Sequence, residues 1–424
     1  MSAAKTPQSA STDARPRCPV DIDLVNPDTF LAGMPLGAFA RMREEAPVFW
    51  HPQPGASGDG FWAVNRPADI REVSRQPDIF SSRELGSLLQ TGEQAGGDSL
   101  ETMRLLLLNM DPPEHTRLRE TVQRAFTPRT IRGLEPRLRE FAEGIVDRAV
   151  AKGEGDFVKD VAAELPLLAI CELMGIPAQD RGRIFDLSNR LIGFEDPEFQ
   201  TSPEDAQVAS TEMYLYANEL AEQRQREPRQ DIITDLLHAQ VDGHALSVSE
   251  FDVFFLLLAV AGNETTRNAI THGMKAFFDH PEQWELFKRE RPGAAADEII
   301  RWATPVMQFQ RTAMSDYVLA GQQIRAGERV GLFYSAANRD SDLLPEPDRF
   351  DIRRTRNLHV AFGGGGPHFC LGANLARAEV QIMFEVIADR MPHIAPTGAL
   401  RPLRSMFING IKTFPVRYVP APPA

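Results

Sequence analysis

Apolar residues recur at helical spacing through most of the chain from residue 113 to about residue 290. Residues 134–151 alternate apolar and charged positions in this way, and residues 166–173 predict the start of a more buried helix. The longest apolar run, residues 253–261, is typical of a helix that is buried on all sides. A last helix is expected from about residue 372 to residue 391. The pattern therefore predicts a mainly α protein.

Strand patterns are short and fall in two regions. Residues 61–64 form an apolar run between turn-rich flanks and predict part of a small strand pair. Residues 317–333 predict a β-rich patch, with Gly321 and Gly327 as turn residues. Residues 81–100 are rich in Ser, Gly and Gln and predict a long, mobile loop.

The chain has 424 residues, which by length alone would suit two or three domains. However, it contains no internal repeat and no low-complexity linker that would divide it. We therefore expect a disordered N-terminal tail over residues 1–20 and one mainly α domain with small β-sheets over residues 21–424.

Composition and charge narrow the class of protein. Hydrophobic residues make up 42% of the chain, so a large core is available, and the net charge of −13 argues against nucleic acid as a partner. The three cysteines, Cys18, Cys171 and Cys370, are far apart and odd in number, which favours a reducing, cytoplasmic location over a disulfide framework. No stretch is apolar enough for a signal sequence or a membrane anchor.

The most informative segment is residues 359–372, HVAFGGGGPHFCLG. Four glycines leave little side chain to keep a flat ligand at a distance, and Cys370 directly precedes a predicted helix. A thiolate there would be stabilised by free backbone N–H groups and the helix dipole. A lone cysteine is usually an inert apolar residue, and a glycine run can cradle phosphate, although no Lys-Ser/Thr pair follows here. A metal-ligand role and an inert role for Cys370 therefore remain open at this point.

The apolar run at residues 253–261 continues into Gly262, Asn263, Glu264 and Thr265. A glycine and a carboxylate are unfavourable inside a buried helix, and such exceptions often mark functional sites. The glycine would let a ligand lie against the helix, while Glu264 and Thr265 would relay protons to it. In the alternative, the helix ends at Gly262 and both polar residues lie in solvent.

Two further segments carry weaker signals. Glu298 and Arg301 are three residues apart on a predicted helix, a spacing that usually marks a solvated surface pair. His115 and Arg119 share one face of a helix that begins after Pro113, and together they could bind a pair of carboxylates. An ordinary amphipathic first turn would look the same.

In this order, the four segments around His115, Glu264, Glu298 and Cys370 resemble the cytochrome P450 family of heme-thiolate monooxygenases. The resemblance covers residues 25–418. It implies a triangular, mainly α, single-domain fold that binds one heme b (iron protoporphyrin IX). It also implies that O2 and two electrons insert one oxygen atom into a C–H bond.

The resemblance further implies roles for individual residues. Cys370 would be the axial thiolate of the iron, whose electron donation favours O–O cleavage, and Glu264 and Thr265 would deliver protons to bound dioxygen. Residues that would contact the heme are His115, Arg119, Arg311 and His368, which suit its propionates, together with Gly262 and Phe362. Residues that would support the cysteine loop are Glu298, Arg301 and, as a third member, Arg353.

One spacing departs from the family pattern. Phe362 lies eight residues before Cys370, one more than is usual. The extra glycine affects the expected carbonyl and N–H positions around the sulfur, but not the assignment of the ligand. This longer loop, with the segments 109–115 and 309–313, is similar to bacterial enzymes that hydroxylate terminal methyl groups of sterols and methyl-branched lipids.

The resemblance also suggests a substrate pocket, although each of its residues could equally belong to the core. The residues expected there are Val306, Met307, Gln308, Phe309, Met406 and Phe407. Because they are mostly apolar, they favour a steroid such as cholest-4-en-3-one or a methyl-branched lipid. A terpenoid such as linalool is the alternative substrate.

An electron-transfer partner is expected as well. The arginines concentrated between residues 117 and 139 are Arg117, Arg119, Arg124, Arg129, Arg132, Arg137 and Arg139. In an otherwise acidic protein, such a cluster could steer an acidic ferredoxin to the cysteine side of the heme, although most charge runs are only solvated faces. Ferredoxin and ferredoxin reductase would then supply electrons that come ultimately from NAD(P)H.

Two other functions remain possible for a heme-thiolate protein. A peroxygenase would use hydrogen peroxide directly, and a non-catalytic ligand-binding protein would turn over no substrate. Neither needs the acid and alcohol at Glu264 and Thr265, so their presence favours a monooxygenase.

Overall fold

The computed structural model describes residues 15–55, 57–89, 98–192, 196, 198, 203–238, 240–241, 244–342 and 344–421. The helices are α1 (Leu36–Glu45), α2 (Pro67–Ser74), α3 (Asp98–Met103), α4 (Glu114–Val122), α5 (Pro128–Lys152), α6 (Glu164–Leu173), α7 (Arg181–Ile192), α8 (Pro203–Arg226), α9 (Ile232–His238), α10 (Val248–Asp279), α11 (Pro281–Glu290), α12 (Ala295–Ala303), α13 (Tyr334–Ala337) and α14 (Ala373–Arg390). Helices thus dominate, as the pattern predicts. The helices predicted at residues 134–151, 166–173 and 372–391 are confirmed as parts of α5, α6 and α14.

The strands are β1 (Val48–Pro52), β2 (Gly60–Val64), β3 (Phe80–Ser81), β4 (Glu154–Asp156), β5 (Gln240–Val241), β6 (His244–Ala245), β7 (Gln308–Ala313), β8 (Tyr317–Leu319), β9 (Gln322–Ile324), β10 (Arg329–Phe333), β11 (Ala395–Pro396), β12 (Arg401–Pro402), β13 (Ile411–Thr413) and β14 (Pro415–Arg417). The largest sheet has the order β1-β2-β10-β7-β3, in which β2 is antiparallel to β1 and parallel to β10. The predicted strand pair and β-rich patch are therefore confirmed. Gly321 and Gly327 have positive φ angles, as turn residues often do.

The central helix α10 runs unbroken through the glycine at which it could have ended. Its N-terminus is fixed by a capping box, in which the Ser247 hydroxyl accepts from the Glu250 N–H and the Glu250 carboxylate accepts from the Ser247 N–H. The helix then continues past Gly262 to its last residue, Asp279, and Glu264 is only 2% exposed. The alternative that places Glu264 in solvent is therefore wrong.

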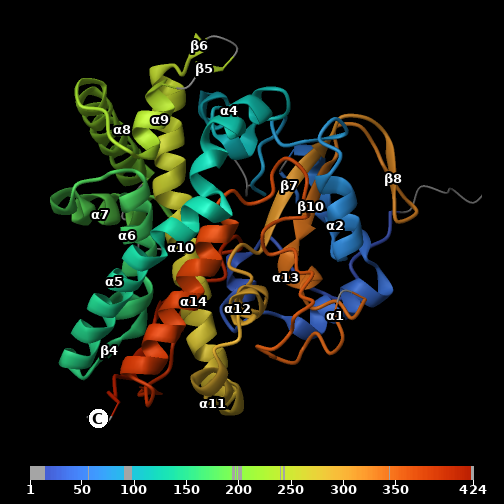
Figure 1. Cartoon of the computed structure of the whole chain (residues 1–424). Helices are drawn as coiled ribbons and strands as arrows, with labels where there is room; N and C mark the ends of the chain where they lie inside the picture. Colours follow the sequence, from blue (N-terminus) through green and yellow to red (C-terminus); the bar gives the residue numbers. More distant parts are fainter. Residues whose placement is uncertain are drawn as a thin grey trace, which may run out of the picture.

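Most of the helices gather on one side of the molecule, and the five-stranded sheet lies on the other together with α1, α2 and α13 (Figure 1). Helix α10 contacts α6, α8, α12 and α14, and α14 also packs against α5. One large apolar cluster fills the helical part, while two smaller clusters lie around the sheet and α1. The segment before α14 and the middle of α10 are thereby brought close to β7.

The predicted tail and loop fall partly outside the described residues. Residues 1–14 and 90–97 are not described. Within the segment expected to be a disordered tail, residues 15–20 contact the folded domain, since Arg17 forms a β-bridge with Trp50 and the Arg15 guanidinium lies 3.8 Å from the Trp50 ring centre. Within the segment expected to be a loop, helix α3 begins at Asp98.

Candidate active site

A large cavity lies among α10, β7 and the segment that precedes α14. The space inside it and at its open mouth, solvent included, amounts to about 1580 Å³. The predicted site residues that line it are His115, Arg119, Gly262, Thr265, Val306, Phe309, Arg311, Phe362, His368 and Cys370. Residues that are far apart in the sequence thus share one cavity.

Cys370 lies directly before α14, on a loop closed by a backbone hydrogen bond. Its N–H donates to the carbonyl of Phe362 over 3.0 Å, and its side chain is accessible from the cavity. Enclosure by the protein raises the pKa of the thiol, against the opposing effects of the Gly372 N–H and the charges of Arg119 and Arg377. Coordination to a metal cation would reverse this direction, because a coordinating thiol is deprotonated.

The glycine run at residues 363–366 is needed for packing of the cysteine loop. Three of the four glycines have positive φ angles between 73° and 95°. A Cβ atom on Gly364 would lie 2.7 Å from the carbonyl oxygen of Ile70, and one on Gly366 would overlap the carbonyl of Ser74. The longer loop is therefore held against α2, which side chains at these positions would prevent.

One wall of the cavity carries basic side chains: His115 and Arg119 from α4, Arg311 from β7, and His368 from the cysteine loop. The two histidine rings lie 4.2 Å apart, and both ring nitrogens of His115 are buried without a hydrogen-bond partner in the described part of the chain. Burial, assisted by the charges of Arg119 and Arg311, lowers the pKa of His115 to about 4. Burial likewise lowers the pKa of His368 well below its usual value. Buried donors and cations of this kind match the two ionised carboxylates of heme.

The residues present fit heme rather than a bare metal ion. Within the described ranges, no group of three or more His, Cys, Asp or Glu side chains is arranged to hold a metal. A metal bound to Cys370 would therefore take its other ligands from a cofactor, as heme iron does. Cys370 would hold the iron, and the basic wall would hold the propionates.

The α10 wall separates the two residues of the predicted acid–alcohol pair. Thr265 lines the cavity, and its hydroxyl donates to the Ala261 carbonyl over 3.0 Å. Glu264 is buried but is not a lining residue, because its carboxylate forms an ion pair with Arg267 and accepts from Asn268 Nδ2 over 2.7 Å. The structure thus brings the alcohol to the cavity and holds the acid away from it.

Gly262 also lines the cavity, as expected. A Cβ atom added there would lie 3.4 Å from Cδ1 of Ile170 on α6, which is an ordinary contact. The helix packing by itself therefore does not require glycine at this position.

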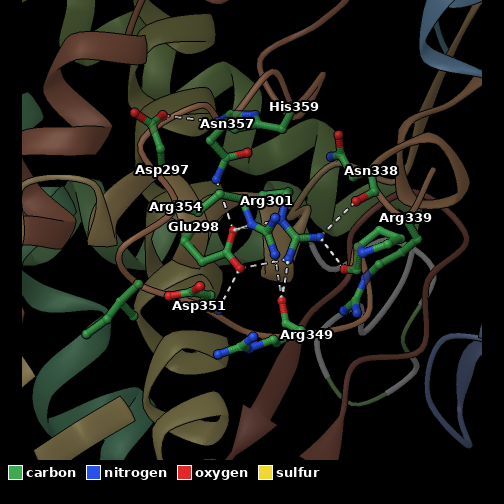
Figure 2. Close-up of polar contacts among 12 residues, drawn as sticks. Asp297, Glu298, Arg301, Asn338, Arg339, Arg349, Asp351, Arg354, Asn357 and His359 are labelled. Carbon is green, nitrogen blue, oxygen red and sulfur yellow. Dashed lines mark hydrogen bonds and ion pairs between the residues drawn. The ribbon is translucent and has the colours of Figure 1, made fainter. Parts of the chain in front are cut away.

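Behind the cysteine loop, Glu298 and Arg301 of α12 form a completely buried ion pair (Figure 2). Both Arg301 Nε and Nη2 donate to the carboxylate over 2.8 Å, and Arg301 Nη1 also donates to the Asn338 carbonyl over 2.9 Å. The side chain of Asn338 accepts from the Val360 N–H over 2.7 Å. Asn357 donates to Glu298 over 3.0 Å. The pair thereby fixes the chain that leads into the cysteine loop, and the surface-pair alternative is wrong.

The third member of this cluster is Arg354, and the prediction of Arg353 is wrong. Arg354 Nε lies 3.3 Å from Glu298 Oε2, and Figure 2 draws both side chains in the same cluster. Arg353 instead pairs with Glu290 at the surface, where its side chain is 56% exposed. The two neighbours point in different directions because a turn follows Asp351, whose carboxylate accepts from the Arg353 N–H.

Only some of the residues predicted for the substrate pocket line the cavity. Val306 and Phe309 line the cavity, and the ring of Phe407 lies 5.5 Å from that of Phe309 without lining the cavity itself. Met307, Gln308 and Met406 were also expected to line the cavity, but they lie elsewhere. Met307 and Met406 belong to an apolar cluster beside the sheet, and Gln308 is buried away from the cavity. On β7, alternation places Phe309 and Arg311 on the cavity face and Gln308 on the other.

The sequence analysis missed the apolar lining contributed by other elements. These residues include Leu107, Leu108, Ile170, Phe254, Leu257 and Leu258. Leu257 and Leu258 lie three and four residues after Phe254 and four and three residues before Ala261, so helical periodicity within residues 253–261 would have grouped them.

Comparison with known proteins identifies the family of this chain. A family model described as cytochrome P450 matches residues 293–391. A steroid C26-monooxygenase from Rhodococcus jostii is 50% identical over 409 residues, which cover 96% of this chain and 86% of that protein. A methyl-branched lipid omega-hydroxylase from Mycobacterium tuberculosis is 43% identical, covering 90% of each chain.

The fold comparison gives the same result. A Mycobacterium marinum cytochrome P450 solved with pseudoionone superposes with a TM-score of 0.87 at 39% identity, covering 96% of this chain and 100% of that chain. No helix in the described ranges is long and apolar enough to span a membrane. The sequence identities, the fold and the cysteine loop agree: the chain belongs to the cytochrome P450 family and is a heme-thiolate monooxygenase.

Proposed function

We propose that this protein hydroxylates a terminal methyl group of a steroid side chain, as on cholest-4-en-3-one, or of a methyl-branched lipid. The observation that carries the proposal is the cavity in which Cys370 and Thr265 share walls with apolar side chains such as Phe254, Leu258 and Phe309. Such a lining favours an apolar substrate. The names of the relatives from Rhodococcus jostii and Mycobacterium tuberculosis support this substrate class.

The heme would supply oxygen activation, consuming O2, two electrons and two protons to give the alcohol and one water. The chain itself would contribute binding, orientation and protons. Cys370 would anchor the iron, and His115, Arg119, Arg311 and His368 would neutralise the propionates. The apolar walls would exclude water and orient the substrate.

Thr265 would hold or pass a proton at its hydroxyl, at the cavity wall. Glu264 would act behind it, and its side chain would have to leave Arg267 to reach the cavity. A hydroxyl at this position favours a monooxygenase over a peroxygenase or a ligand-binding protein.

A terpenoid is the second candidate substrate. It is favoured by the structural relative solved with pseudoionone. An apolar lining suits a terpenoid as well as a steroid or branched lipid, so binding and product analysis are the measurements that distinguish these substrate classes.

Titrating the purified ferric protein with cholest-4-en-3-one is expected to convert the heme saturably from low to high spin, because a substrate that fits the apolar lining would exclude water from the cavity beside the iron. The measurement is the optical spectrum, with a methyl-branched fatty acid and linalool titrated in parallel. Product analysis with O2 and reductant should then give the terminal alcohol. Conversion by linalool alone would contradict the steroid and lipid proposal and support the terpenoid.

The electron donor that we propose is a ferredoxin, reduced by a ferredoxin reductase with electrons from NAD(P)H. Of the seven arginines predicted to attract it, the exposed ones are Arg124, Arg129 and Arg132. The others are engaged: Arg119 lines the cavity, while Arg117, Arg137 and Arg139 pair with glutamates. Arg132 also borders a groove with Asn374 and Arg377 of α14, which places it near the cysteine loop. A cytoplasmic location would give access to these donors.

The double variant Arg129→Glu/Arg132→Glu is expected to lower the rate of reduction by ferredoxin about tenfold at low salt, because electrostatic steering changes association rates by 10-fold or more. The measurement is stopped-flow reduction at several ionic strengths, and the wild-type rate should fall as salt rises. Arg226→Glu is the control, since Arg226 is 75% exposed on α8. Equal rates in both variants, with no salt response, would refute this docking surface.

A further inference from the structure

Asp297 is a carboxylate on α12 that none of the roles above uses. Its Oδ1 atom lies 3.0 Å from His359 Nε2 and accepts from Arg377 Nε over 2.7 Å. Figure 2 labels Asp297 and His359 beside the buried ion pair of the same helix. His359 begins the segment that carries the cysteine loop, whereas Arg377 lies on α14, directly after that loop. One carboxylate therefore connects the two ends of the loop that holds Cys370.

At the first end of the loop, His359 passes the contact on to the backbone. Its Nδ1 atom accepts from the Ala361 N–H over 3.2 Å. A ring nitrogen that accepts carries no proton, so the ring proton is on Nε2 and is donated to Asp297. The preceding N–H, that of Val360, belongs to the Glu298 network described above. Two consecutive backbone donors at the entry of the loop are thus held by two separate networks.

At the second end of the loop, Arg377 lies against the phenylalanine of the cysteine loop. Its guanidinium is 4.6 Å from the centre of the Phe362 ring, and the Phe362 carbonyl accepts from the Cys370 N–H over 3.0 Å. Although burial alone would raise it, the hydrogen bonds from His359 and Arg377 hold the pKa of Asp297 below its usual value. The ionised Asp297 therefore both fixes the guanidinium in place and offsets its positive charge.

We propose that Asp297 is a positioning residue for the cysteine ligand. It orients His359 and Arg377, and through them it fixes both ends of the cysteine loop and balances the charge beside the thiolate. The inference rests on Cys370 as the ligand of the heme iron and does not depend on the proposed substrate. Asp297 differs from the neighbouring Glu298 because it also reaches α14.

The first test is an equilibrium redox titration of the heme, without substrate or ferredoxin. Reduction adds an electron, so Asp297→Asn, which leaves the charge of Arg377 unbalanced, should raise the midpoint potential. Arg377→Gln removes the positive charge and should lower it. Each change is expected to alter the ratio of ferrous to ferric protein about tenfold, as a neighbouring charge commonly does for an ionisation, and for one electron this corresponds to about 59 mV.

The matched controls are Asp389→Asn and Arg390→Gln. They remove the same charges from the end of α14 remote from the cysteine loop, where each residue belongs to a surface ion pair. Both controls should keep the wild-type potential. Potentials that move in the same direction in Asp297→Asn and Arg377→Gln, or in neither, would overturn the proposal, because a general loss of structure does not reverse its sign with the charge removed.

The second test is the lifetime of the thiolate-type spectrum of the carbon monoxide complex. His359→Phe keeps a ring but should lose this spectrum about tenfold faster than the wild type, because the Ala361 N–H is left without its acceptor. His359→Asn, whose amide oxygen can take the place of Nδ1, should restore part of the lifetime. His393→Phe, at an exposed position after α14, is the control. Wild-type lifetimes in His359→Phe would contradict the role of Asp297 at this end of the loop.

Both tests are independent of turnover. A wild type without a thiolate-type spectrum would show that Cys370 is not the ligand and would overturn this inference as well. If the wild type has the spectrum and the two charge variants move the potential in opposite directions, the role of Asp297 is supported, even where neither steroid nor lipid is hydroxylated and the proposed substrate is wrong.

Discussion

Replacing Arg301 with methionine is expected to lower the free energy of unfolding by about 3–5 kcal/mol, the usual cost of breaking a buried ion pair. Glu298 is 0% exposed, so its carboxylate would lose two charge-assisted hydrogen bonds without gaining water. Arg354 would remain 3.3 Å away but would not replace both contacts. Because stabilities of about 5–15 kcal/mol are typical, this loss is a large fraction of the total. The measurement is urea unfolding followed by circular dichroism.

The matched control is Arg353→Met, which removes the same type of side chain at the surface, two residues after Asp351, rather than from the core. Its exposed pair with Glu290 is expected to contribute less than about 1 kcal/mol. The Arg301 variant should also bind heme less tightly, since Asn338 and Val360 connect the pair to the cysteine loop. Equal unfolding midpoints for both variants would contradict the role given to this cluster.

Replacing Cys370 with histidine is expected to abolish the thiolate-type spectrum of the carbon monoxide complex and to reduce hydroxylation below detection. The reason is that Cys370 is the cysteine accessible from the cavity, directly before α14. A neutral imidazole donates less electron density to iron than a thiolate, so O–O cleavage is no longer favoured. The measurements are the optical spectrum and product formation.

Cys171→Ala is the control for this variant. Cys171 is buried within α6, and burial raises the pKa of its thiol to about 12, so it remains an apolar side chain. The control should therefore keep both the spectrum and the activity. A thiolate-type spectrum that survives in Cys370→His would exclude Cys370 as the iron ligand.

Features set by local sequence could be predicted. Helix α5 contains the predicted residues 134–151, and its ends carry local signals, with Thr127 capping the N-terminus and Gly153 ending the helix at φ 82°. The cysteine loop was also recognisable, because four glycines before a lone cysteine are rare. The sequence left two alternatives for α10 at Gly262, because a glycine can end a helix or let a ligand lie against it; the structure shows that the helix continues.

Features that depend on side-chain direction could not be predicted. Arg354 rather than Arg353 reaches Glu298, because a turn decides which neighbour points inward. Met307 lies in the core beside the sheet although it precedes β7, whose Phe309 faces the cavity. In each case the sequence predicted a residue that is adjacent to, or near, the one that occupies the position in the structure.

The sequence by itself determined the mainly α fold and singled out the cysteine and the basic residues that meet in the cavity, because these follow from periodicity and from rare residue combinations. The tertiary structure alone decided which carboxyl groups approach the site. It holds Glu264 against Arg267 and leaves Glu379 bordering the cavity. The physical reason is that successive side chains on a helix diverge by about 100°, so only the packing of α10 against α14 settles which of them face the same space.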